Sequence, residues 1–204
     1  LDLVPGHSAV DNPWFLESGK DERNAWTDRY IWRPMTQSPN LNSPYESIRG
    51  FLGGIAERPD AAAVNCFSTQ ACLNYGFGTV TEDWQFAADS PEAVQGRLLI
   101  QDIMDFWLGL GADGFRVDVA HGLAKDLDRD DLESYKVCEH VLPSDGSHPL
   151  YDRDEVHDIY REWRKVFNEY NPPAFAVAEA WVNPDRQHLY ASTEELGQVF
   201  NFEF

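Results

Sequence analysis

The chain has 204 residues, of which 43% are hydrophobic and 13% aromatic, which is enough apolar material for a sizeable core in a globular protein. Asp and Glu number 35 against 16 Lys and Arg, and a net charge of −19 would repel a phosphate backbone, so nucleic acid is excluded as a partner and a neutral substrate is favoured. No apolar run is long enough to span a membrane and no charged leader precedes one, so we expect neither a membrane span nor a signal peptide.

The first half of the chain combines one strand-like segment with a long irregular stretch. Residues 1–4 are strand-like. Residues 8–89 are rich in Pro, Asn, Gly, Ser and aromatic residues and show no sustained helical or strand period. We interpret residues 8–89 as a long insertion with a small irregular fold of its own.

From residue 90 onward, helices and strands alternate. The predicted elements are a helix at 90–111, a strand at 115–119, a helix at 154–170, a strand at 175–179, a short helix opening at Asn183-Pro184 and a strand at 198–204. Such alternation is typical of parallel strands joined by crossover helices. Because both chain ends are strand-like, we expect the chain to begin and end within a sheet.

The cysteines predict no particular chemistry. Cys66, Cys72 and Cys138 form an odd set without a Cys-x-x-Cys pair, so we expect neither a disulfide framework nor a zinc site. A Cys66–Cys72 bridge is left open.

Two neighbouring predicted strands carry carboxylates in different settings. Arg116 and Asp118 share one face of the strand at 115–119, and the arginine would lower the pKa of Asp118 and hold it ionised, as a nucleophile requires. Glu179 follows an apolar strand, and apolar surroundings would raise its pKa and keep it protonated. A retaining glycosidase needs such a pair about 5 to 5.5 Å apart. On pattern alone, a buried ion pair at 116/118 and a solvent-facing strand end at 179 fit equally well.

Five short segments, in chain order, resemble glycoside hydrolase family 13, the α-amylase superfamily. Residues 2–7, 114–118 and 178–181 are similar to its first three signature segments. Residues 73–75 resemble a short motif of its inserted domain B, and residues 30–33 (Tyr-Ile-Trp-Arg) resemble a stretch of its α-glucosidase members. The resemblance spans nearly the whole chain.

The resemblance implies an α/β fold, a partial (β/α)8 TIM barrel of about strands 3 to 6 with an inserted irregular domain B. Residues 1–7 would form barrel strand 3, residues 8–89 the domain B-like insertion, and residues 90–204 the barrel helices and strands 4 to 6. The family's fourth segment, which carries a third carboxylate, is not in these residues. We therefore expect the 204-residue chain alone to be inactive and, with unpaired edges at its two ends, poorly stable.

The resemblance also implies catalytic roles. Asp118 would be the nucleophile that forms a glycosyl-enzyme intermediate, and Glu179 the general acid that protonates the leaving oxygen and then the base that activates water. Arg116 would orient Asp118.

Four further residues match positions that contact or support the sugar. His7 would hydrogen-bond the sugar where cleavage occurs, and Asp2 would support that part of the site. His121 falls where family members contact the sugar on the leaving side, although a helix-start histidine without a ligand fits it equally. Trp181 would stack on a sugar ring or belong to the core.

We predict no cofactor and no metal site. Gly6 stands where many α-amylases have a calcium-ligating Asn, and Cys72 stands where an aspartate often precedes the Leu-Asn pair. Without these two oxygen ligands, calcium is not expected at the usual domain B site.

The favoured function is a retaining hydrolase of α-glucosides or α-glucans, with an oligosaccharide or α-glucoside as substrate. One alternative is a transglycosylase of the same family, which uses the same residues. A second is a non-catalytic barrel that binds carbohydrate or belongs to a transporter. A third is a metal-dependent barrel enzyme with Asp2, His7, Asp118 and Glu179 as ligands, and Arg116 beside Asp118 argues against it because a cation would repel the metal.

Overall fold

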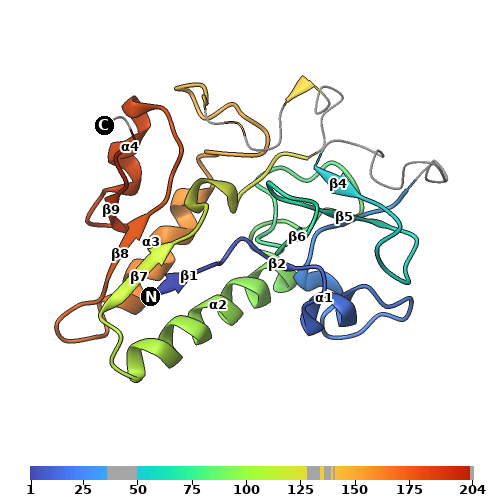
Figure 1. Ribbon diagram of the computed structural model, residues 1–204, viewed down its shortest axis with the longest axis horizontal. Helices are drawn as coiled ribbons and strands as arrows, with labels where there is room; N and C mark the ends of the chain where they lie inside the picture. The colour runs from blue at the N-terminus through green and yellow to red at the C-terminus, as the bar shows by residue number, and fades with distance from the viewer. Residues whose placement is uncertain (36–49, 128–133, 136–138, 140, 203–204) are drawn as a thin grey trace. The chain divides into compact units, whose positions relative to one another are not determined.

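A computed structural model describes residues 1–35, 50–127, 134–135, 139 and 141–202 (Figure 1). The chain divides into two compact units. The barrel unit comprises Leu1–Gly6, Arg97–Lys125 and His140–Phe204, and the insertion unit comprises His7–Gly96 and Asp126–Glu139.

The barrel unit is built on a parallel sheet in which the strands lie in chain order. The order is β1 (Asp2–Leu3), β7 (Gly114–Val117), β8 (Phe175–Ala178) and β9 (Gly197–Val199). Every neighbouring pair in this sheet is parallel. Helices connect the strands from β7 onward, which is the repeating unit of a (β/α) barrel.

The helices follow from apolar spacing and local capping. Helix α2 (Pro91–Gly109) crosses the boundary between the units, α3 (Val156–Phe167) leads to β8 and α4 (Pro184–Tyr190) leads to β9. The helix predicted at 154–170 corresponds to α3, and the apolar residues that it buries include Val156, Ile159, Tyr160, Trp163 and Phe167. At the start of α4 the Asn183 side chain accepts a hydrogen bond from the Asp185 N–H at 3.1 Å, and proline occupies the first helical position. No helix in the described part of the chain is both long and apolar enough to cross a membrane.

The insertion unit contains two small antiparallel sheets. One pairs β2 (His7–Ala9) with β6 (Gln70–Cys72), and the other has the order β3 (Trp32–Arg33), β5 (Ala61–Ala63), β4 (Phe51–Leu52). Each of these strands has only two or three residues, which is too short for a period of two to show in the sequence. The short helix α1 (Pro13–Ser18) and a 3-10 turn, η1 (Thr27–Arg29), complete the described elements.

An aromatic cluster forms the core of the insertion unit. Phe15, Tyr30 and Trp32 are all buried. The Phe15 ring stacks on Trp32 at 5.3 Å between ring centroids and meets Tyr30 edge-on at 5.2 Å. Aromatic packing therefore takes the place of long regular elements in holding this unit together.

The structure answers the question that the cysteines left open. Cys66 is disulfide-bonded. Cys72 is buried on β6 and is not part of a disulfide, which excludes the Cys66–Cys72 bridge. Cys138 lies outside the described residues.

A glycine lets β7 and β8 approach each other. Gly114 pairs with Phe175, and a Cβ added at Gly114 would lie 2.1 Å from the Phe175 carbonyl oxygen. This distance is far inside van der Waals contact, and the obstacle is backbone that cannot rotate away. Position 114 therefore has to be glycine for β7 and β8, the strands that lead to Asp118 and Glu179, to pair.

We predict that Gly114→Ala lowers the free energy of unfolding of the intact protein by about 1–3 kcal/mol, because the new methyl group forces β7 and β8 apart. Denaturant unfolding measures the loss. Gly109→Ala on α2 is the matched control, since a Cβ there meets nothing within 4 Å, and it should leave the stability unchanged or raise it by up to about 1 kcal/mol. Equal stability of the two variants would contradict the close approach.

Candidate active site

One guanidinium on β7 collects carboxylates from three neighbouring strands. Arg116 Nη1 lies 2.6 Å from Asp118 Oδ1, and Nη2 lies 2.6 Å from Glu179 Oε2. Asp2, which is paired in register with Arg116 on β1, is also in reach, with Oδ1 at 3.2 Å from Nη1. The structure thus brings four predicted site residues together at the carboxyl ends of the strands, where barrel enzymes place their active sites.

The three ion pairs differ in their exposure to water. The Asp2 side chain is 68% exposed, so its pair with Arg116 is screened and contributes little. The side chains of Asp118 and Glu179 are 19% and 18% exposed, so their attraction to Arg116 is much less screened. Arg116 therefore acts mainly as a link between Asp118 and Glu179.

The charge of Arg116 is secure. Burial lowers the pKa of Arg116, but the negative charges of Glu179, Asp118 and Asp2 outweigh that effect, and the pKa of the guanidinium is raised. Arg116 consequently remains a cation at physiological pH, and it presents donors to both carboxylates.

The apolar setting expected for Glu179 is wrong. Glu179 Oε2 accepts hydrogen bonds from Arg116 Nη2 and, at 3.0 Å, from the backbone N–H of Val119. The apolar residues that precede Glu179 lie on β8 and include the buried Ala176 and Ala178, whereas Glu179 lies just beyond the strand end. The groups that contact the Glu179 carboxylate come from β7 and the residues just after it. The residues next to Glu179 in the sequence therefore do not predict its environment.

The turn after Asp118 has an unusual backbone. Val119 adopts left-handed dihedral angles (φ 43°, ψ 48°), which are costly for a β-branched residue. This conformation opens the 3-10 turn η2 (Ala120–Gly122) and accompanies the hydrogen bond from the Val119 N–H to Glu179. The Ala120 N–H donates to the Glu179 carbonyl oxygen at 2.9 Å, so two successive backbone donors bind Glu179. Sequence reasoning missed Val119, because valine at a strand end carries no signal for a left-handed turn.

Hydrogen bonds from buried residues of the barrel unit hold η2 in place. The Tyr160 hydroxyl on α3 donates to the Ala120 carbonyl oxygen. The Asp152 N–H donates to the His121 carbonyl oxygen at 2.7 Å, and the buried Asp152 carboxylate binds Arg186 Nε at 2.6 Å and the Tyr190 hydroxyl at 2.8 Å. These bonds connect the turn that follows Asp118 to α3 and α4.

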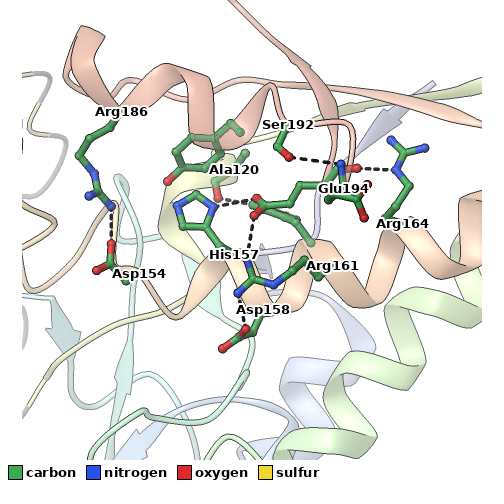
Figure 2. A network of polar contacts seen from close by, with 12 residues as sticks. Ala120, Asp154, His157, Asp158, Arg161, Arg164, Arg186, Ser192 and Glu194 are labelled. Carbon is green, nitrogen blue, oxygen red and sulfur yellow. Dashed lines mark hydrogen bonds and ion pairs between the residues drawn. The ribbon is translucent and has the colours of Figure 1, made fainter.

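A second polar cluster ties α3 to the segment before β9 (Figure 2). His157 Nδ1 and Arg161 Nη1 bind the two carboxylate oxygens of Glu195, at 2.8 and 3.0 Å. Arg164 Nε donates to the Glu195 carbonyl oxygen at 2.7 Å. The figure also shows Arg186 reaching Asp154, at 2.7 Å, beside this cluster. One face of α3 is therefore fixed to the segment that leads into β9 by charge-assisted hydrogen bonds.

The remaining predicted sugar contacts lie in distinct places. His121 is buried in η2, and its ring centroid lies 5.1 Å from that of Tyr151. Trp181 is partly exposed and stacks on Phe202 with ring centroids 3.6 Å apart, so it does not belong to the buried core. His7 lies on β2 of the insertion unit, where Nδ1 is 3.4 Å from the Asn65 side-chain nitrogen. Their roles toward a sugar stay predictions.

Metal ligands are not gathered in the part of the chain that the structure describes. Within the described ranges, no group of three or more His, Cys, Asp or Glu side chains could hold a metal ion. The carboxylates of Asp2, Asp118 and Glu179 do converge, but they converge on the Arg116 guanidinium, which takes the position that a metal ion would need.

Parallel strands in chain order, helical crossovers and carboxylates at the strand ends define part of a (β/α)8 barrel. A family model described as "Alpha amylase, catalytic domain" matches residues 1–204, and the chain belongs to this family. The family and the partial-barrel fold predicted from the sequence are thus confirmed.

The proteins to which the chain is similar include glycoside hydrolases and a transporter heavy chain. The chain is 31% identical over 211 residues to an oligo-1,6-glucosidase of Parageobacillus thermoglucosidasius, and the match covers 100% of this chain and 33% of that protein. It is 27% identical over 185 residues to the mouse amino acid transporter heavy chain SLC3A1, covering 84% of this chain and 24% of that protein. The crystal structure of the Bacillus licheniformis trehalose-6-phosphate hydrolase TreA is similar with a TM-score of 0.70 at 25% identity, covering 98% of this chain and 32% of that one. The chain spans about a third of the length of the glucosidases that it matches.

We predict that Tyr160→Phe destabilises the intact protein by about 1–3 kcal/mol, because the buried Ala120 carbonyl loses its side-chain donor while the ring packing is kept. Urea unfolding measures the change. The matched control is Tyr170→Phe, which removes a hydroxyl bonded to Asp105 near the surface and should cost less than about 0.5 kcal/mol. If the two variants are equally stable, Tyr160 does not support η2.

Proposed function

We propose that the chain carries the nucleophile and the acid/base of a retaining α-glycoside hydrolase that acts on α-glucosides or α-glucans. The observation that carries this proposal is the Arg116 bridge, with 2.6 Å contacts to both Asp118 and Glu179. It places two carboxylates from neighbouring strands on the two terminal nitrogens of one guanidinium, and a retaining mechanism uses two carboxyl groups that lie close together. Family membership and the oligo-1,6-glucosidase relatives support the choice of an α-glucoside as the substrate.

In the first step, a carboxylate oxygen of Asp118 forms a bond to the anomeric carbon while the bond from that carbon to the leaving oxygen breaks. Ion pairing with Arg116 favours the ionised form of Asp118, which is the form with an electron pair to donate. Arg116 also fixes the orientation of the carboxylate, and orientation of a nucleophile is a large part of its reactivity.

Glu179 has to enter this step protonated, and it gives that proton to the leaving oxygen and regains one from water in the second step. Both hydrogen bonds from Arg116 and Val119 converge on Oε2, so we assign proton transfer to Oε1. In the second step a water oxygen bonds to the anomeric carbon, the bond to Asp118 breaks, and Glu179 takes a proton from the water.

Transglycosylation uses the same two residues and differs only in the acceptor. If a sugar hydroxyl instead of water meets the glycosyl-enzyme, Glu179 takes the proton of that hydroxyl and a new glycosidic bond forms. Asp118 and Glu179 can serve both hydrolysis and transglycosylation, and the acceptor decides between the two reactions. The ratio of hydrolysis to transfer products distinguishes them.

A non-catalytic role is the alternative that the SLC3A1 relative brings forward. Under this alternative, Arg116, Asp118 and Glu179 would serve only as a structural ion-pair network. Inactivity of the intact wild-type protein on both α-glucosides and maltooligosaccharides would favour it.

We predict that Asp118→Asn and Glu179→Gln each lower kcat/KM of the intact protein on maltose by about three orders of magnitude or more. Azide, which attacks without a general base, should restore turnover of α-glucosyl fluoride in Glu179→Gln and not in Asp118→Asn, because fluoride leaves without a proton and only Asp118 forms the covalent bond.

The control is Asp113→Asn, an exposed carboxylate just before β7, which should retain wild-type activity. Rescue of both variants by azide, or of neither, would overturn the assignment of roles. Full activity of either variant would remove that residue from the mechanism.

We further predict that Arg116→Lys lowers kcat by about two orders of magnitude. A single ammonium group cannot donate in fixed geometry to Asp118 and Glu179 at once, whereas the guanidinium does so through separate nitrogens. Steady-state kinetics on an aryl α-glucoside measure the effect, with circular dichroism to confirm folding. Retention of wild-type kcat by a folded Arg116→Lys protein would contradict the role of the bridge.

A further inference from the structure

We propose that the insertion unit carries a second carbohydrate-binding pocket, which takes a single neutral sugar ring and shares no residue with the proposed active site. The cavity, which we call the insertion pocket, has a volume of about 250 Å³. Its lining comes from residues 23–34, 58–60 and 74–86, all of which belong to the insertion unit.

Aromatic rings form one wall of the insertion pocket. Trp84 is partly exposed, and Phe77 and Phe86 also line the pocket. Its ring is held by near-perpendicular contacts with Phe77 and Phe51, at centroid distances of 5.5 and 5.9 Å. A fixed aromatic ring suits the apolar C–H face of a pyranose, which buries area on it without requiring a charge.

Polar groups at the pocket suit hydroxyls. Arg58 Nε and Nη2 both bind Asp60 Oδ2, at 2.8 and 2.5 Å, but the buried Nη1 has no acceptor among the described residues. A buried donor without an acceptor is unfavourable, and Arg58 is one of the residues that line the pocket. Asp83, which is exposed and also lines the pocket, can accept from other hydroxyls of the same ring.

The charge and size of the pocket narrow the ligand class. Two arginines and three aspartates line it, so the lining carries one net negative charge, and Arg23 and Arg58 are already paired with Asp28 and Asp60. An anion such as phosphate is therefore disfavoured. About 250 Å³ is below the range typical of pockets for drug-sized ligands, which suits one ring better than an oligosaccharide.

The test is binding of methyl α-D-glucopyranoside to the intact protein carrying Asp118→Asn, which prevents turnover. Amide hydrogen exchange should slow in residues 82–86 as the sugar is added, with a saturable dependence that gives a dissociation constant. Trp84→Ala should raise this dissociation constant about tenfold. Trp14→Ala should leave it unchanged, because Trp14 is a partly exposed tryptophan of the same unit that does not line the pocket.

Each outcome decides the proposal. No slowing of exchange in residues 82–86 at saturating sugar overturns it, and so does equal weakening by Trp84→Ala and Trp14→Ala. If Trp84→Ala does not fold, Asp83→Asn replaces it, with about threefold weaker binding expected and unchanged binding overturning the proposal. Inorganic phosphate that protects residues 82–86 more strongly than the glucoside does would make the pocket an anion site.

The inference uses the proposed function only for the choice of sugar. Exchange protection is read in an inactive variant, whereas the proposed hydrolysis is read from turnover of the wild-type protein. Failure to observe sugar binding at the insertion pocket would therefore not argue against the proposed hydrolysis, and failure to observe hydrolysis would not argue against the binding.

Discussion

The interaction on which the site depends is the contact of one guanidinium with the carboxylates of Asp118 and Glu179. Two carboxylates this close to a common point repel each other unless a cation lies between them. Arg116 is that cation, and the raised pKa of its guanidinium means that it does not lose the charge. The parallel pairing of β7 with β8 sets the separation of the two acids, and Gly114 allows the strands to meet.

The rest of the barrel unit keeps this arrangement rigid. Val119 is held in a left-handed conformation that it would not adopt alone, and the bonds of Ala120 to Tyr160 and to the Glu179 backbone oppose its relaxation. Asp152 and Arg186 in turn anchor the turn to α4. Such a buried, largely satisfied polar network favours one conformation, and the proposed catalytic pair needs its geometry to be fixed before the substrate binds.

The sequence predicted those features that depend on neighbours along the chain. The helix α3, the start of α4 at Asn183-Pro184 and the shared face of Arg116 and Asp118 all follow from patterns among nearby residues. The setting of Glu179, the left-handed Val119 and the disulfide at Cys66 depend on residues distant in sequence, and no local pattern records them. Assigning Glu179 an apolar environment from its own strand was wrong for this reason.

The central claim is that Asp118, oriented by Arg116, becomes covalently bonded to the sugar. The most direct test is to incubate the intact protein with 5-fluoro-α-D-glucosyl fluoride, whose ring fluorine slows the release of the glycosyl-enzyme, and to map the adduct by peptide mass spectrometry. We predict one added fluoroglucosyl group on the peptide that contains Asp118, with fragment ions that place it on that residue. A protein that turns over α-glucosides but forms no adduct, or forms it on Glu179, would contradict the account.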